Sequence, residues 1–344
     1  MRKLSWFNKV MYFFNIVLTL LTVFAYLLPF MAPRLFPILS VFTLVLPLML
    51  VFNFLFFIYW LFQAKRQMLL SGLILLLGIT FVNKFFKFSS TTLPDAADDV
   101  TLMSYNVRLF NLYEWLPDND IAQKIPAFVK EKNPDIVCLQ EYNKVGDNSF
   151  SQYKYSYIFS PKGQTGQAIF SYFPIINRGS IEFPESANNA IYADIKRGND
   201  TLRIYSMHLQ SIKISPDIHE NIDEEKSKLI FRRISNAFEK QQLQADLVEK
   251  HKSECPYAMV ICGDLNNSAF SYVYRSIRGD MNDAFEEAGG GFGKSYNYKY
   301  YPARIDYFFA DEKLEVKEFN TFSNFVNSDH FPIMTRLNFI KDKE

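Results

Sequence analysis

At residues 257–266 the sequence reads YAMVICGDLN, and this stretch decides the fold. Its apolar run stops at Gly263, and a short apolar run that ends at glycine is typical of a buried strand. The strand delivers the carboxylate of Asp264 and the carboxamide of Asn266 at its end. A turn is the simpler explanation, because Asp and Asn often bond their own backbone in turns. A functional site is favoured because four other strand ends carry residues of the same kind.

Composition divides the chain near residue 90. Residues 1–88 hold eight of the 37 Lys and Arg residues and none of the 36 Asp and Glu residues. The remainder therefore holds 29 basic and 36 acidic residues, a balance of −7 that the overall charge of +1 hides. Three cysteines are too few for a disulfide framework in 344 residues. We expect two units of different character.

Three long apolar stretches lie in the first unit: Val10 to Phe30, Ile38 to Phe62 and Met68 to Phe86. Each reaches the ~20 residues that an α-helix needs to cross a bilayer. Buried helices of a soluble domain are disfavoured, because the stretches are apolar on every face. We predict that residues 1–88 form an anchor of three transmembrane helices.

Basic residues indicate the orientation of this anchor. Five lie before the first stretch or between the second and third: Arg2, Lys3, Lys9, Lys65 and Arg66. Three lie on the other side: Arg34, Lys84 and Lys87. Since positive loops stay cytoplasmic, the N-terminus is predicted to be cytoplasmic. The chain beyond residue 88 is then extracytoplasmic or periplasmic, attached to an inner or plasma membrane.

A polar segment, residues 89–99, is predicted to link the anchor to a domain at residues 100–344. In that domain short strands alternate with helical stretches and turn clusters, the pattern of an α/β or mixed α+β sandwich. Residues 190–195 are expected to pair with residues 201–207 as a hairpin. The GGGFG run at 289–293 is predicted to be a loop rather than a phosphate cradle, because no clear helix start follows it.

Polar side chains at the predicted strand ends form the candidate site. They are Asn106, Glu141, His208, Asp264, Asn266, Asp306, Asp329 and His330. Converging carboxylate and amide oxygens suit a hard cation such as Mg²⁺, with Mn²⁺ as the alternative. A metal held by oxygens beside histidines suits displacement at phosphorus. Asp306 and His330 are a plausible pair, in which the carboxylate fixes the imidazole tautomer.

Several motifs then resemble those of the endonuclease/exonuclease/phosphatase superfamily, whose members include DNase I-like nucleases, neutral sphingomyelinases and inositol polyphosphate phosphatases. They occur in the order of that family: SYN at 104–106, LQE at 139–141, AIFS at 168–171, FPI at 173–175, MHL at 207–209, GDLN at 263–266, RIDY at 304–307 and SDHFP at 328–332. The resemblance implies a DNase I-like fold, a four-layer α/β arrangement of two sheets flanked by helices, with the site at one end.

The resemblance also implies a metal centre. Glu141 would be the main Mg²⁺ ligand, Asn106 would support the metal site, and Asp329 would lie near it.

The same resemblance implies the acid and base groups. Asp264 would orient or deprotonate the attacking water, and Asn266 would hold a phosphoryl oxygen. His330, backed by Asp306, would act as the other acid/base group or bind the phosphate. His208 would lie near the scissile phosphate.

Substrate and partners remain open. The leading interpretation is a membrane-anchored, Mg²⁺-dependent phosphodiesterase acting on nucleic acid. A domain with a balance of −7 is a poor non-specific binder of duplex DNA, however, because that affinity depends on neutralising phosphates with Lys and Arg. A phospholipid or sphingomyelin headgroup is the alternative substrate. A membrane-held binding module without catalysis is the alternative of another class.

Overall fold

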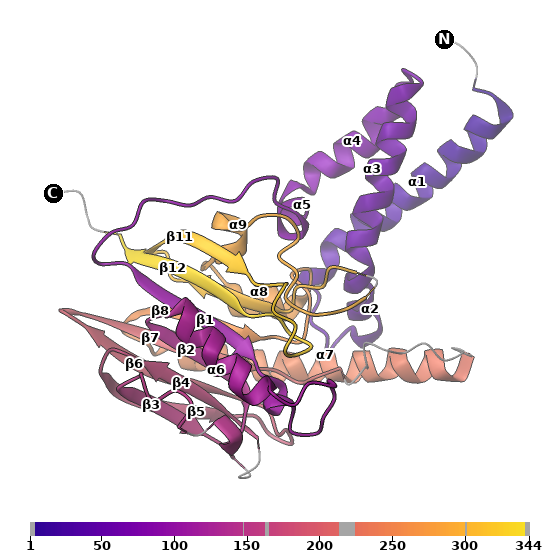
Figure 1. Cartoon of the computed structure of the whole chain (residues 1–344). Coiled ribbons are helices and arrows are strands. Elements are labelled where there is room, and N and C mark those ends of the chain that lie inside the picture. The colour runs from indigo at the N-terminus through magenta and orange to yellow at the C-terminus, as the bar shows by residue number, and fades with distance from the viewer. Residues whose placement is uncertain (1–3, 147, 162–164, 213–223, 300, 341–344) are drawn as a thin grey trace.

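The protein consists of an N-terminal group of apolar helices and a layered α/β domain (Figure 1). The computed structural model describes residues 4–146, 148–161, 165–212, 224–299 and 301–340. Two N-terminal segments, Trp6–Phe30 and Pro37–Phe62, are helical and long and apolar enough to cross a membrane. Their main helices are α1 Trp6–Leu27 and α3 Leu46–Phe62. These segments correspond to the first two stretches predicted from the sequence.

The third predicted stretch is broken. It forms two short helices, α4 Met68–Leu77 and α5 Ile79–Phe85, which are bent by 74° at Gly78. A Cβ atom at Gly78 would lie 2.0 Å from the hydroxyl of Tyr26 on α1, and that hydroxyl donates a hydrogen bond to the Ile74 carbonyl at 3.0 Å. The described residues therefore hold two clear spans, or three if the bent pair counts as one.

The α/β domain contains two mixed sheets of six strands each. The first has the order β11-β12-β1-β2-β4-β3, with β1 Val100–Asn106, β2 Ile136–Tyr142, β3 Tyr155–Phe159, β4 Gly166–Ser171, β11 Leu314–Thr321 and β12 Ile333–Phe339. The second has the order β5-β6-β7-β8-β10-β9, with β5 Ile175–Glu182, β6 Asn189–Arg197, β7 Asp200–His208, β8 Ala258–Asp264, β9 Asn282–Asp283 and β10 Asp306–Ala310. The predicted hairpin is confirmed as β6 and β7.

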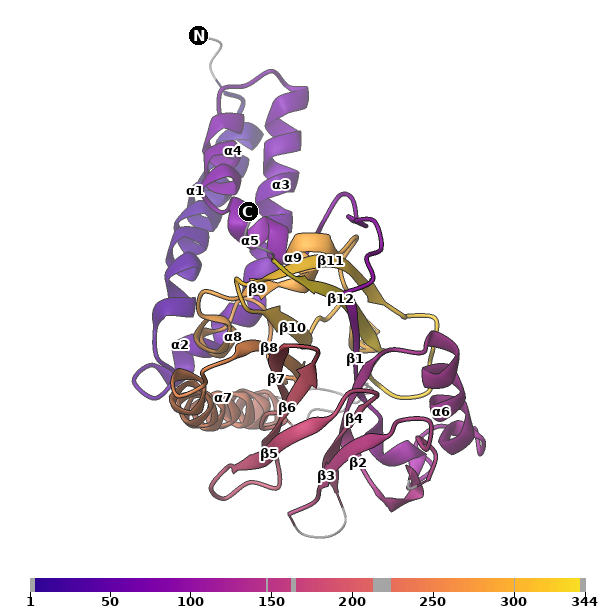
Figure 2. The same ribbon diagram turned by 90° about the vertical axis from the view of Figure 1, so that its left-hand side faces the viewer.

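Apolar side chains fill the space between the sheets and cover their outer faces. Figure 2 shows the two sheets with helices on both sides of the pair. Leu102, Ile204 and Val260 belong to the central cluster between the sheets. The other helices and 3₁₀ turns are α2 Pro37–Val41, α6 Ile121–Lys132, α7 Glu224–Ser253, α8 Tyr272–Arg278, α9 Ala284–Ala288, η1 Leu28–Phe30, η2 Phe42–Val45, η3 Arg108–Asn111 and η4 Lys144–Gly146. Helix α6 packs on the first sheet, and α7 with α8 packs on the second. The predicted sandwich flanked by helices is confirmed.

The N-terminal helices pack directly against this domain. One buried cluster contains residues from both parts: Ala25, Leu28, Leu46, Leu50 and Phe270. Phe270 follows the strand end at Asp264 by only six residues, so the helices lie close to the candidate site. The predicted linker is also docked, since the Leu93 N–H donates to the Lys317 carbonyl on β11 at 2.9 Å.

Candidate active site

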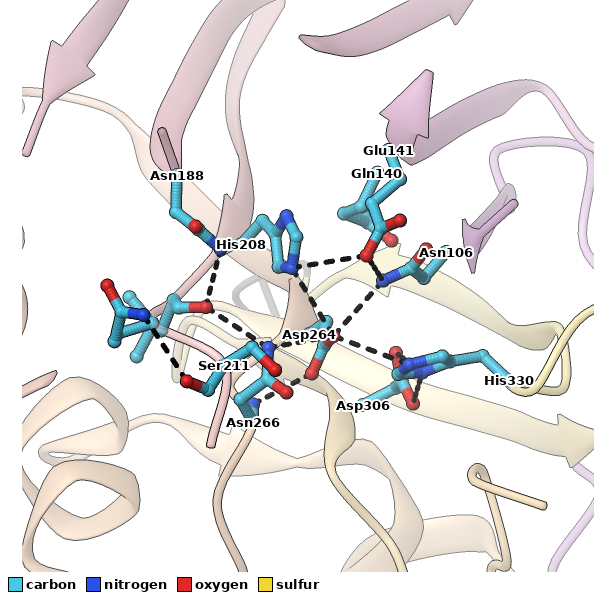
Figure 3. A network of polar contacts seen from close by, with 12 residues as sticks. Asn106, Gln140, Glu141, Asn188, His208, Ser211, Asp264, Asn266, Asp306 and His330 are labelled. Atoms are coloured by element: carbon cyan, nitrogen blue, oxygen red, sulfur yellow. Dashed lines mark hydrogen bonds and ion pairs between the residues drawn. The ribbon is translucent and has the colours of Figure 1, made fainter. Parts of the chain in front are cut away.

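Strand register brings three of the predicted residues into one row of the second sheet. Strand β8 lies between β7 and β10. Its last residue, Asp264, is paired with His208 on β7 and with Asp306 on β10. The side chains of all three gather at one edge of the sheet (Figure 3).

The first sheet supplies Asn106 and Glu141 to the same place. The side-chain amide of Asn106 donates to Glu141 Oε1 at 3.2 Å and to Asp264 Oδ2 at 3.1 Å. The second of these hydrogen bonds crosses from one sheet to the other. Groups that are 158 residues apart in the chain therefore meet in one network (Figure 3).

Glu141 owes its position to an irregular strand. Its φ is +49°, and the register between β2 and β4 shifts between Gln140 and Tyr142. Such a bulge re-aims a side chain at the end of a strand. Gln140 points inward and donates to the Ser206 hydroxyl at 2.9 Å, while the Glu141 carboxylate keeps 27% of its surface exposed. The bulge thus separates a buried structural amide from an accessible acid.

His330 and Asp306 form a buried pair. The Nδ1 atom of His330 lies 3.1 and 2.9 Å from the two carboxylate oxygens of Asp306, and its Nε2 atom lies 3.5 Å from Asp264 Oδ2. Burial lowers the pKa of His330, but the charges of Asp306 and Asp264 outweigh burial and raise it to about 10. The imidazole is therefore positively charged at neutral pH.

Asp264 stands at the centre of the network. Its Oδ1 accepts from the Asn266 N–H at 2.7 Å, and its Oδ2 accepts from the Asn266 amide at 3.0 Å. Burial raises the pKa of Asp264 to about 8, although the charge of His330 and these hydrogen bonds act in the opposite direction. When ionised, this carboxylate is a stronger base than an ordinary aspartate.

His208 closes the site on the side of β7. Its Nε2 atom lies 3.7 Å from both Glu141 Oε1 and Asp264 Oδ2, which is longer than a hydrogen bond. Burial lowers the pKa of His208, so its ring is neutral at neutral pH. The site therefore holds one charged and one neutral imidazole.

Asp329 is placed differently from the other seven predicted residues. Its carboxylate pairs with Arg108 at 3.3 Å and accepts from the Ser328 hydroxyl at 3.2 Å. The Ser328 hydroxyl also donates to the Asn106 carbonyl at 2.9 Å, which keeps this loop beside β1. Asp329 thus borders the site and is held by a basic residue.

Sequence reasoning missed several residues of the site. Arg108 faces Asp329, and the Tyr296 ring lies 5.0 Å from the His330 ring. The Asn188 amide donates to the Leu209 carbonyl at 2.7 Å, next to His208. Arg108 could have been noticed because it follows Asn106 by two positions, but no local pattern marks Tyr296 or Asn188.

The oxygen donors fit a hard divalent cation. Glu141 is an accessible carboxylate, and no Lys or Arg among the described residues forms an ion pair with it. The Asn106 amide nitrogen faces Glu141, and its oxygen accepts from the Arg108 N–H at 3.1 Å. Turning the amide over would break that hydrogen bond and bring the oxygen toward Glu141 as a second oxygen ligand. Asp264, Asp306 and His330 form a second group, with ligand atoms within 4.8 Å of one another. In that group His330 and Asp306 already contact each other at 2.9 Å and all three residues are buried, which leaves Glu141 as the more accessible donor.

Comparison with known proteins finds a family match for most of the chain. The model described as "Endonuclease/Exonuclease/phosphatase family" matches residues 103–330, and residues 8–85 match a domain of unknown function (DUF8431). No curated protein matches the chain in sequence.

Solved structures share the fold of the α/β domain. A humanized TDP2 from D. rerio aligns with a TM-score of 0.55 at 16% identity, covering 70% of this chain and all of that one. The human Nocturnin catalytic domain with bound sulfate aligns at 0.54 and 16% identity, covering 72% and 97% of the two chains. A family member from Bacteroides vulgatus aligns at 0.54 and 18%, covering 70% and 99%. Because the family model spans well over half of its residues, this chain belongs to the endonuclease/exonuclease/phosphatase family.

Proposed function

We propose that this chain is a metal-dependent phosphodiester hydrolase held at a membrane by its N-terminal helices. One observation supports this most strongly: Asp264 is bonded to Asn106 of the opposite sheet and lies 3.5 Å from the charged ring of His330. A base, a cation and a metal-ligand position therefore lie around one point. Burial raises the pKa of Asp264, and shifted carboxyl groups beside histidines cluster at functional sites.

Glu141 and Asn106 would hold the Mg²⁺ ion, with Asp329 at the border of its site. A bound Mg²⁺ supplies neutralisation of negative charge on the phosphoryl oxygens. Arg108 would keep Asp329 oriented through their ion pair.

The remaining residues would move the protons. Asp264 accepts a proton from the attacking water as its oxygen bonds to phosphorus. The bond from phosphorus to the leaving oxygen breaks, that oxygen takes up a proton from solvent water, and the proton on Asp264 passes back to solvent. His330, held by Asp306, faces the phosphoryl group with a positive charge. Asn266 would turn one amide hydrogen from the Leu209 carbonyl or from Asp264 to a phosphoryl oxygen. His208, whose Nε2 atom is 3.7 Å from Asp264 Oδ2, would lie near the scissile phosphate.

A test of this function uses the full chain in detergent with bis-p-nitrophenyl phosphate. We expect Mg²⁺-dependent turnover that EDTA abolishes and added Mg²⁺ restores. Glu141→Ala and His330→Ala should each lower kcat/KM by at least about 100-fold. Glu315→Ala, at an exposed carboxylate on β11, is the matched control and should leave turnover unchanged. Equal turnover in all variants would reject the assigned site.

Two classes of phosphodiester substrate are considered, nucleic acids and lipids. A nucleic acid gains support from a relative, since one D. rerio TDP2 structure, 18% identical with a TM-score of 0.53, is described as complexed with single strand DNA product. At that identity the likeness shows the fold alone. The surroundings of the site in this chain favour the alternative, a lipid.

A further inference from the structure

A cavity of about 410 Å³ opens directly beside the candidate site. Its lining includes Asn266 and Tyr296, which contact Asp264 and His330 respectively. Its lining also includes Leu44 and Phe85 of the N-terminal helices. Its volume lies in the range of small-molecule sites, ~300–1,000 Å³. The cavity therefore connects the polar site to the apolar part of the chain.

A second, larger groove adjoins this cavity. It measures about 720 Å³, lies among α3, α4 and α5, and shares Phe85 and Phe292 with the first cavity. Every side chain that lines it is apolar. Several are open to the outside, including Phe54 at 53% and Leu76 at 67% exposed. Phe85 and Phe292 therefore line both spaces, and the two neighbouring spaces together are called the path below.

Backbone hydrogen bonds fix the two parts of the chain where the two spaces meet. The Lys87 and Gly291 backbones form a bridge, with hydrogen bonds of 2.9 Å in each direction. This bridge holds the loop after α9 against the end of α5. Phe85 packs edge-on against Phe292 with ring centroids 5.2 Å apart, so residues from the helices and from the α/β domain form one wall.

We propose that this path binds the hydrocarbon chain of a membrane lipid whose phosphodiester headgroup reaches the candidate site. The inference rests on the proposed hydrolase function and names its substrate class. Apolar chains gain from burial in such a groove, whereas the wholly apolar groove offers a nucleotide no cation and no hydrogen-bond partner.

The two basic residues beside the first cavity are already engaged. Arg304 is 7% exposed and pairs with Asp283 at 2.7 Å. The Lys84 ammonium lies 4.8 Å from the centre of the Tyr274 ring. Neither is free to neutralise a phosphate backbone along this path, which favours a single headgroup with an apolar tail over a nucleic-acid strand.

The test compares methyl, octyl and dodecyl 4-nitrophenyl phosphate diesters as substrates of the full chain in one detergent. Turnover of the methyl ester reports the proposed hydrolase function, and the chain-length dependence reports this inference. We expect kcat/KM to rise at least about tenfold from methyl to dodecyl, far less than full burial of eleven methylenes would give. Partition into micelles is the same for every variant, so comparison of variants removes it.

Two variants change the path without touching the proposed acid, base or metal groups. Phe292→Asp places a charge where the spaces meet, and Ala303→Trp fills the first cavity. Both should reduce the preference for dodecyl to within about twofold of methyl, with methyl ester turnover retained. Ile176→Asp, at an exposed apolar residue on β5, is the matched control and should keep the preference.

A second readout does not need turnover. Dodecyl methyl phosphate should raise the Tm of the wild-type chain and of Ile176→Asp, but not that of Phe292→Asp. The inference is overturned if the preference and the Tm shift persist in both path variants. It is also overturned if a single-stranded oligonucleotide is cleaved with a higher kcat/KM than the dodecyl ester.

Discussion

At the scale of single residues, Gly263 has the strictest requirement near the site. Its φ is +125°, and a Cβ atom there would lie 2.1 Å from the Met207 carbonyl oxygen. Because that oxygen belongs to the backbone of β7, the clash cannot be relieved by a side-chain rotation. We expect Gly263→Ala to lower the Tm by on the order of 10 °C, measured by thermal unfolding in detergent.

Gly198 provides the control for this substitution. Its φ is also positive, at +57°, but nothing lies within 4 Å of a Cβ built there. Gly198→Ala should therefore lower the free energy of unfolding by only about 1–2 kcal/mol, the penalty of a left-handed backbone conformation for alanine. This corresponds to a Tm loss of a few degrees. If both variants lost the same amount, the clash with Met207 would not be the cause.

Single residues also show how far the sequence could predict the site. Asp264 and Asp306 were predictable because Asp264 ends one apolar run and Asp306 begins another, and the ends of neighbouring strands meet at one edge of a sheet. The bulge that turns Glu141 outward could not be predicted, because it depends on the pairing of β2 with β4. The ion pair between Arg108 and Asp329 joins residues 221 positions apart, and nothing local indicates it.

At the scale of elements, the segment between the two parts is fixed by Asp99. Its carboxylate is 7% exposed and accepts from Lys317 at 2.9 Å and Arg336 at 2.7 Å. Burial raises the pKa of Asp99, but hydrogen bonds from Lys317, the Ala96 N–H and Arg336 outweigh burial and hold it well below its usual range. We expect Asp99→Asn to destabilise the chain by about 3 kcal/mol at pH 7, because Lys317 loses its buried partner.

The pH dependence of this effect has a definite sign. A carboxyl group whose pKa is lowered by folding stabilises the folded chain above its unfolded pKa of about 4. The stability difference between wild type and Asp99→Asn should therefore be constant above pH 5 and shrink as the pH falls below about 4. Asp95→Asn is the control, since Asp95 is 91% exposed and its pair with Arg336 contributes little. A difference that grew toward low pH would contradict the assignment.

The N-terminal elements separate what local sequence determines from what it does not. Apolar composition alone predicted helices at Val10 to Phe30 and Ile38 to Phe62, and the structure has them at Trp6–Phe30 and Pro37–Phe62, because stretches of that length need no partner to be recognised. At the bend, the hydroxyl of Tyr26, 52 positions earlier in the chain, donates to the Ile74 carbonyl and leaves no room for a Cβ at Gly78. This contact between two helices cannot be read from the residues of the third stretch alone.

At the scale of the whole molecule, the two parts are joined more closely than composition indicates. The charge boundary near residue 90 predicted an anchor and a domain connected by a linker. In the structure, Phe270 and the cavity beside Asn266 connect the helices to the site itself. Such contacts link residues more than 200 positions apart, and only the folded chain reveals them.

The arrangement of basic residues predicts on which side of the membrane the α/β domain lies. Lys65 and Arg66 occupy the turn between α3 and α4, at the end of the helices away from the domain (Figure 1). At the near end, the Lys84 ammonium packs over the Tyr274 ring and the Lys87 ammonium donates to the Glu286 carbonyl, so both are bound to the domain. Arg34 is also exposed at the near end, but Lys9, Lys65 and Arg66 give the far end the larger free positive charge, so we expect the far end to be cytoplasmic. Protease added to spheroplasts should then cut the α/β domain while a cytoplasmic marker stays intact. Protection of the domain until lysis would reverse the orientation, and the lipid path would then open from the cytoplasmic leaflet.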